Sequence, residues 1–197
     1  MANIDAAFGL RPYKMLGAGA NTSGLVSYPI QTIATAGSAS VIYQGTTVIP
    51  LANGMLDIVG NANGGTVPIL GVLNGTPTFN NQYPGTAAVK ANTAVTGLIS
   101  ANPDQLFLIN CDAAAADLIV HANANLATGI TGNSLNGISY GELAVSTVNT
   151  TNTLNLRIIG FEDTPDNDDA TVAGRLAIVL LNNQFYRYNA NGTGAGI

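Results

Sequence analysis

Two side chains in this sequence could form a nucleophile and its general base. Cys111 is the only cysteine and His121 the only histidine, ten positions apart. A thiol beside an imidazole can be activated, because the imidazole takes up the thiol proton. No motif surrounds either residue, and a buried cysteine at a strand end with a hydrogen-bonded histidine nearby is the commoner arrangement. We therefore predict that the protein is not an enzyme.

The acidic segment after residue 161 could bind a cation. Its carboxylates are Glu162, Asp163, Asp166, Asp168 and Asp169. Oxygen ligands of this kind suit Ca²⁺, but their spacing does not match the EF-hand loop. The segment therefore favours a solvated loop whose charges keep it out of the core, with cation binding left as an alternative. No Gly-rich motif follows a strand and opens a helix, so we expect no phosphate-bearing cofactor.

Charge is scarce along the chain. Only 9% of the 197 residues are charged and 47% are hydrophobic, whereas about 25% are charged in an average soluble protein. Such a composition is not that of a disordered chain, which combines few apolar residues with much charge. A monomer with so few charges is poorly protected against association. We therefore expect much of the surface to be buried against copies or partners.

The same composition argues against nucleic acid and membranes as partners. The formal net charge is −5 and the six Lys and Arg residues are scattered, so no basic stripe could neutralise phosphates. The apolar runs are far shorter than the roughly 20 residues that cross a bilayer. The first residues also lack the apolar segment of a secretory signal. A single cysteine permits no internal disulfide, which fits synthesis in a reducing cytoplasm.

Two apolar, β-branched runs give the strongest strand signal. Residues 154–161 and 175–181 flank the acidic segment, which contains Pro165 and is too long for a tight hairpin turn. Upstream, turn residues recur about every 8–12 positions, which is typical of a sandwich or barrel. They bound candidate strands at 26–30, 41–43, 45–51, 56–59, 67–73, 95–99 and 106–111.

We therefore predict an all-β fold, a single antiparallel β-barrel or β-sandwich domain over residues 25–188. An extended N-terminal arm (1–24) precedes it and a Gly-rich C-terminal tail (189–197) follows. At most one short helix is expected, in the alanine-rich segment 112–118, where helix propensity dominates and Asp112 is available as N-cap. Residues 123–137 are rich in Asn and Gly and predict a loop.

Two segments carry candidate contact residues. The arm contains Phe8, Leu10 and Tyr13 without helical or alternating spacing, so these side chains either dock on a partner or pack back on their own domain. Each one that is fully buried contributes about 1.5–3 kcal/mol. The polar, proline-containing loop 74–87 holds Phe79 and Tyr83. A loop of this length either contacts a neighbour or folds over its own aromatic residues.

The N-terminus resembles the start of small virion structural proteins of tailed bacteriophages. The pattern is Met-Ala-Asn at 1–3 followed by Phe-Gly-Leu-Arg-Pro at 8–12. Weaker matches follow at 43–48, 69–72, 104–107, 156–160 and 165–167, so the likeness covers most of the chain. It departs at Tyr13, where a Val or Leu is expected, and at Asp168-Asp169, which has no counterpart.

The resemblance implies a capsid decoration, or cement, protein. Such proteins bind the outer surface of the assembled phage head as homo-oligomers and stabilise capsomer junctions. The implied partners are the major capsid protein and further copies of this chain, with a trimer favoured over a dimer. The implied location is the outer capsid surface of the virion, after synthesis in the host bacterial cytoplasm. We expect the partner-binding group to be Phe8, Leu10, Arg11, Pro12 and Tyr13, with the Arg11 guanidinium pairing a carboxylate.

A glycan-binding or adhesion module of a phage tail or fibre is the alternative function. All-β domains rich in Asn and Tyr can present shallow glycan sites. The chain contains no Trp, which argues mildly against this alternative because stacked aromatic rings supply much of the affinity for sugars. A head-completion role for a protein of similar composition is also left open. None of these functions requires a metal or a cofactor.

Overall fold

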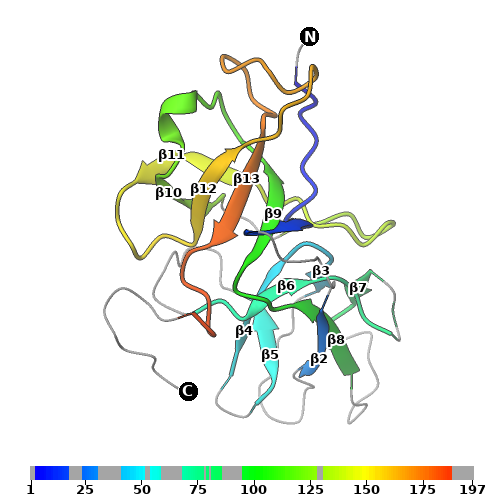
Figure 1. Ribbon diagram of the computed structural model, residues 1–197. Coiled ribbons are helices and arrows are strands. Elements are labelled where there is room, and N and C mark those ends of the chain that lie inside the picture. The colour runs from blue at the N-terminus through cyan, green and yellow to red at the C-terminus, as the bar shows by residue number, and fades with distance from the viewer. Residues whose placement is uncertain are drawn as a thin grey trace.

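A computed structural model gives the fold of the protein (Figure 1). It describes residues 3–17, 24–30, 41–51, 54–58, 68–77, 79, 81–85, 95–127 and 131–187. Within them it has thirteen strands and one short 3-10 helix, which confirms the predicted all-β class. Figure 1 shows two β structures placed end to end, with an open sheet above a small barrel. The predicted Gly-rich tail lies outside the described residues.

The upper structure is a six-stranded sheet in which every neighbouring pair is antiparallel. In sheet order its strands are β1 (Arg11–Met15), β9 (Gln105–Asn110), β13 (Leu176–Leu181), β12 (Leu156–Phe161), β10 (Asn123–Leu126) and β11 (Leu143–Asn149). The paired apolar runs predicted from the sequence are β12 and β13, which lie near the middle of this sheet. Their register shifts between Ile158 and Gly160, where a bulge bends the strand.

The lower structure is a closed barrel. In barrel order its strands are β2 (Leu25–Ile30), β5 (Leu56–Ile58), β4 (Thr47–Pro50), β6 (Gly71–Leu73) and β8 (Val95–Ser100). All its pairs are antiparallel except β2 and β5, which meet in parallel at Ile30 and Leu56. Pro50 ends β4, as expected of a residue that cannot donate to a ladder. A two-stranded sheet of β3 (Ile42–Tyr43) and β7 (Gln82–Tyr83) stands beside the barrel.

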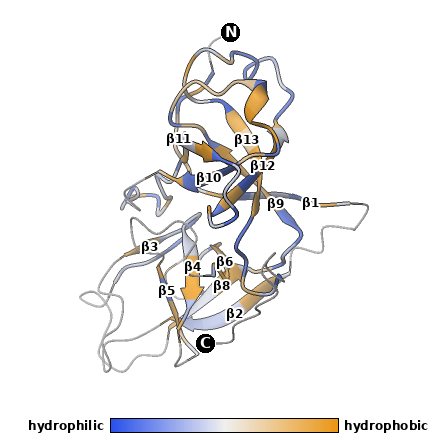
Figure 2. Ribbon diagram, turned by 90° about the vertical axis from the view of Figure 1, so that its left-hand side faces the viewer, coloured by the Kyte–Doolittle hydropathy of each residue, from blue (hydrophilic) through white to orange (hydrophobic). Residues whose placement is uncertain are grey.

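Each structure has its own hydrophobic core. The sheet core gathers around Phe107 and Ile158, and the barrel core around Ile99 and Tyr83. Figure 2 shows the hydrophobic colour on β13 in the sheet and on β4 in the barrel. Buried Gln184 joins the two, since its Nε2 donates to the carbonyl oxygens of Leu70 at 3.0 Å and of Ala101 at 2.9 Å. These bonds fix the segment after β13 across the junction.

Several predicted elements differ from the structure. The arm supplies β1, while β7 and β10 fall in segments that were predicted as loops. The described residues hold one short helix, as predicted, but it is a single 3-10 turn, η2 (Asp117–Ile119), at the end of the expected segment 112–118. Asp112 does not cap it; the Asp112 Oδ1 instead accepts a hydrogen bond at 2.9 Å from the backbone N–H of Val145, within β11. A tertiary hydrogen bond thus outweighs local helix propensity. No helix in the described residues is long and apolar enough to cross a membrane.

Candidate partner-binding site

The beginning of the arm is fastened to the acidic segment. Asn3 is largely buried; its Nδ2 donates to the Asp169 carbonyl oxygen at 2.7 Å and its Oδ1 accepts from the Asp169 N–H at 3.3 Å. Further along, the Asn110 side chain donates to the Ile4 carbonyl oxygen at 3.3 Å. In Figure 1 this part of the arm runs down beside the loop between β12 and β13. The arm is therefore held against its own sheet from its first described residue.

The arm then crosses two loops at very close range. The Gly9 N–H donates to the Gly141 carbonyl oxygen at 3.1 Å, and the Leu10 N–H donates to the Gly45 carbonyl oxygen at 2.9 Å. A Cβ atom placed on Gly9 would lie 2.7 Å from the Gly45 oxygen and 2.8 Å from the Ser139 Cβ. Gly9 also has a φ of +71°, a conformation that glycine adopts without steric cost. No larger residue fits this crossing without a shift of the backbone.

Beyond the crossing the arm becomes the edge strand β1. Arg11 pairs with Leu108 and Pro12 with Phe107, and the register shifts before Met15. Proline, a lysine and a bulge on an edge strand all hinder the addition of a further strand. β1 therefore presents its side chains, and not its backbone, to any partner.

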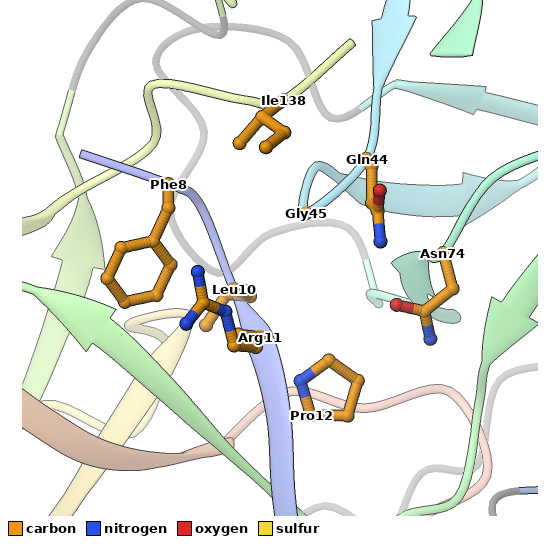
Figure 3. A pocket seen from close by; sticks show the side chains of 8 residues that line it. All are labelled: Phe8, Leu10, Arg11, Pro12, Gln44, Gly45, Asn74 and Ile138. Atoms are coloured by element: carbon orange, nitrogen blue, oxygen red, sulfur yellow. The ribbon is translucent and has the colours of Figure 1, made fainter. Parts of the chain in front are cut away.

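A small hollow opens where the arm passes the barrel loops (Figure 3). Its cavity volume is about 90 Å³. The residues that line it are Phe8, Leu10, Arg11, Pro12, Gln44, Gly45, Asn74 and Ile138. Figure 3 shows the Phe8 and Arg11 side chains close together on the arm, with Gln44 and Asn74 across from them. We call this feature the arm hollow.

The arm hollow combines apolar walls with one cation. The Arg11 guanidinium carbon lies 4.3 Å from the centre of the Phe8 ring, a cation–π contact that orients the exposed guanidinium. Pockets for small molecules and cofactors enclose about 300–1,000 Å³, far more than this hollow offers. Its size suits one aliphatic side chain, and Arg11 beside it suits a carboxylate. The arm hollow therefore offers room for an apolar group with a cation beside it.

The structure divides the five predicted arm residues into two groups. Phe8, Arg11 and Pro12 meet at the arm hollow. Leu10 also lines the hollow, but its side chain is only 1% exposed and belongs to the sheet core, so it packs on its own chain and offers a partner almost no surface. A hydrogen bond to the Glu162 carboxylate raises the pKa of Tyr13, so its hydroxyl is engaged within the chain as well.

The two candidate contact residues of loop 74–87, Phe79 and Tyr83, lie in different surroundings. Tyr83 is fully buried in the barrel core, and burial raises its pKa. It therefore cannot contact a partner, in line with the alternative that the loop folds over its own aromatic residues. Phe79 is half-buried and lines a different depression together with Asn81 and Gln82.

Cys111 and His121 do not form a catalytic pair. Cys111 is fully buried, and burial raises the pKa of its thiol to about 12, so the nucleophilic thiolate is scarce at neutral pH. His121 is exposed on the turn after η2, with a φ of +73° and its backbone N–H donated to the Ile158 carbonyl oxygen at 2.8 Å. Across the described ranges no hydrogen bond joins the two side chains.

The acidic residues do not converge on a cation. Among the residues that the structure describes, no group of three or more His, Cys, Asp or Glu side chains could hold a metal ion. Asp169 instead accepts hydrogen bonds from the Thr171 N–H at 2.9 Å and hydroxyl at 2.6 Å, which lower its pKa. Arg175 instead links the segment to the turn η2: its Nε donates to the Asn167 carbonyl oxygen at 3.4 Å, and its guanidinium also donates to the Ala115 carbonyl oxygen at 2.7 Å and pairs with Asp117 at 2.8 Å.

Sequence reasoning missed the far wall of the arm hollow. Gln44, Asn74 and Ile138 come from three separate loops, and none stands in a motif. The usable signal was Gly9-Leu10, a glycine next to a large apolar residue within an otherwise extended arm, which is typical of a close backbone approach. Comparison of the chain with protein-family models, curated proteins and solved structures found no significant match in any of the three.

Proposed function

We propose that the protein is a non-enzymatic capsid decoration protein that binds the outer surface of an assembled phage head. The observation that carries this proposal is the arm hollow, where a firmly held arm displays Phe8, Arg11 and Pro12 beside a cavity of about 90 Å³. A site of this size and chemistry suits a protein partner better than a metabolite. The N-terminal resemblance to phage virion proteins and the charged content of 9% support the same role.

The arm hollow explains how such a protein would attach. An apolar side chain of the major capsid protein enters the hollow, and a neighbouring carboxylate pairs with Arg11. Each contact of this size is weak, but an oligomer that engages several capsid subunits at once gains affinity through effective concentration. A trimer at a local three-fold position would engage three equivalent subunits. Capsomer junctions are then braced by many weak contacts and not by one strong site.

The direct test is binding to shells that lack the protein. Purified protein is first sized by size-exclusion chromatography with light scattering, then mixed with empty shells and sedimented. A decoration protein behaves as a small oligomer and saturates the shell at a copy number comparable to that of the capsid protein. A monomer that stays in the supernatant at every concentration refutes the proposal.

Two charge reversals on one strand test the attachment site. Arg11→Glu places a carboxylate at the arm hollow and is expected to weaken shell binding by at least about tenfold, since it turns an attraction into a repulsion. Lys14→Glu makes the same charge change on β1 at a residue that does not line the hollow, so it should bind within about twofold of the original. Equal losses from both variants would show that only net charge matters and that the arm hollow is not the site.

A further inference from the structure

An asparagine followed by a glycine lies at the arm hollow, and this pair of residues is prone to spontaneous chemical change. The side-chain amide of asparagine is one of the labile groups of proteins, and a following glycine has no Cβ atom to hinder attack by its backbone nitrogen. The described residues contain two such pairs, Asn74-Gly75 and Asn136-Gly137, and a leucine precedes each of them. Asn74 lines the arm hollow, whereas Asn136 does not.

The Asn74-Gly75 pair forms a bulge against β8. The Asn74 N–H donates to the Leu98 carbonyl oxygen at 2.8 Å, and the Leu98 N–H donates to the Gly75 carbonyl oxygen at 2.9 Å, so two residues oppose one. Gly75 is buried, yet in the described part of the chain its own N–H donates to no acceptor. A buried backbone N–H without a partner is rare. It leaves this nitrogen unhindered by a hydrogen bond.

The side chain of Asn74 is also unengaged. It is half-buried, and no described residue forms a hydrogen bond with its amide group. Figure 3 shows it on the wall of the hollow across from Arg11 and Pro12. The attacking nitrogen belongs to the next residue, so covalent bonds already hold the two reacting groups close together. Rotation about the side-chain bonds of Asn74 brings its Cγ to the Gly75 nitrogen, and a five-membered ring can close.

The Asn136-Gly137 pair has both reacting groups occupied. The Gly137 N–H donates to the Asn133 carbonyl oxygen at 2.8 Å, and the Asn136 Oδ1 accepts the Ile138 N–H at 3.0 Å. Ring closure would first have to break both bonds. Because Asn136 is exposed and Asn74 is half-buried, exposure alone predicts the opposite order of reactivity.

We propose that Asn74 is a site of deamidation and that the reaction weakens attachment through the arm hollow. The Gly75 nitrogen loses its proton and bonds to the Asn74 Cγ, the bond between Cγ and Nδ2 breaks, and ammonia leaves with that proton. Water then opens the cyclic imide at either carbonyl carbon, which gives aspartate or isoaspartate. The reaction consumes one water molecule and needs no oxidant or reductant.

The product changes the charge of the arm hollow. It places a carboxylate on the wall that faces Arg11 in Figure 3, where it competes for the guanidinium and repels the carboxylate of a partner. Isoaspartate also lengthens the backbone by one methylene group at the bulge. This effect rests on the proposed function, because it requires that shells bind at the arm hollow, whereas the reaction itself does not.

Peptide mapping by mass spectrometry measures the reaction at both pairs. The full chain is incubated at mildly alkaline pH, either folded in buffer or unfolded in concentrated urea. In the folded protein Asn74 should react at least about fivefold faster than Asn136, which is roughly the rate effect of one hydrogen bond that must be broken first. In urea the two rates should converge, because the unfolded chain keeps neither arrangement and both pairs follow a leucine. Equal rates in the folded protein, or the same ratio in urea as in buffer, would overturn the proposal.

Cosedimentation with shells tests the effect on attachment. Asn74→Asp should bind at least about tenfold more weakly than the original protein. Asn136→Asp makes the same change outside the arm hollow and should bind within about twofold of the original. Asn74→Gln keeps an amide but closes a larger ring much more slowly, so its affinity, whatever its starting value, should not decline during incubation.

The two measurements separate this inference from the proposed function. A protein that never binds shells refutes the proposed function and the effect on attachment, while peptide mapping still decides whether Asn74 is the reactive site. If Asn74→Asp is folded by circular dichroism and binds shells as tightly as Asn136→Asp, the proposed function stands and the effect of deamidation is refuted.

Discussion

Replacement of Gly9 by alanine tests whether the arm crossing is a structural requirement of the fold. Alanine at a φ of +71° costs about 1–2 kcal/mol. The new Cβ would lie 2.7 Å from the Gly45 carbonyl oxygen, so the arm must move away. That movement weakens the hydrogen bonds from the Gly9 and Leu10 N–H groups, each of which contributes about 1 kcal/mol. Alanine also stabilises the folded protein by about 0.4–1 kcal/mol, because it lowers the conformational entropy of the unfolded chain.

The free energy of unfolding should therefore fall by about 2–4 kcal/mol in Gly9→Ala. At about 2–4 °C per kcal/mol for a chain of this length, the melting temperature falls by about 5–15 °C. Gly17→Ala is the matched control, because Gly17 has a φ of +84° but no atom of the described residues lies within 4 Å of an added Cβ. Its free energy of unfolding should fall by only about 0–1.6 kcal/mol.

Urea and thermal unfolding of both variants, followed by circular dichroism, measure this difference. Equal destabilisation of Gly9→Ala and Gly17→Ala would refute the reasoning, because it would mean that the close approach of Gly9 to Gly45 adds nothing to the cost of the backbone conformation. Because Phe8 and Arg11 flank the crossing, Gly9→Ala should also weaken shell binding at temperatures where the protein stays folded.

Two further predictions concern buried polar groups. Burial raises the pKa of Cys111 to about 12 in the folded state, whereas an unfolded thiol has a pKa of about 8.5. Above about pH 8.5 the unfolded state loses a proton that the folded state keeps, so the free energy of unfolding should fall by about 1.4 kcal/mol per pH unit. The thiol should also react with a disulfide reagent only in urea. Asn167 is 2% exposed, and its side chain donates to the Glu162 carbonyl oxygen at 2.7 Å and accepts from the Leu176 N–H at 2.5 Å. Asn167→Ala should therefore lower the free energy of unfolding, measured in urea, by about 2–4 kcal/mol. Asn152→Ala, at an exposed position, should change the free energy of unfolding by less than about 0.5 kcal/mol.

The sequence predicts well those strands that carry their own apolar pattern. β13 alternates between half-buried Leu176 and Ile178 and buried Ala177 and Val179, and its β-branched residues suit a pleated surface. Its partner β12 carries a similar run ending at Phe161. The barrel strands likewise have short β-branched runs bounded by turn residues. Local composition is informative here because each strand buries residues that the sequence already marks as apolar.

Other strands exist only because of their partners. β10 has the sequence Asn-Ala-Asn-Leu, which is poor in residues that favour strands. It lies between β11 and β12, and the buried Asn123 side chain donates to the Thr151 carbonyl oxygen at 2.9 Å and accepts from Arg157 at 3.2 Å. Those partners lie about thirty positions away in the sequence. No local rule could have predicted the strand, because tertiary hydrogen bonds decide it.

The arm hollow, too, could be predicted from the sequence only in part. The types of Phe8, Arg11 and Pro12 indicated a contact surface, and the structure brings all three to one cavity. Leu10 looked equivalent in the sequence, but the arm turns at Gly9 and directs this leucine into the sheet core. A pattern of residue types cannot distinguish the two outcomes, because they depend on where the Gly45 and Gly141 backbones cross the arm.

One loop both lines the arm hollow and holds the arm beside it. Within residues 131–141, Ile138 lines the hollow and the Gly141 carbonyl oxygen accepts the Gly9 N–H. The same loop therefore sets the position of Phe8 and Arg11 relative to the opposite wall of the hollow. If the arm attaches the protein to a shell as proposed, every copy would be held in the same orientation, and many weak contacts of this kind would add up to useful avidity.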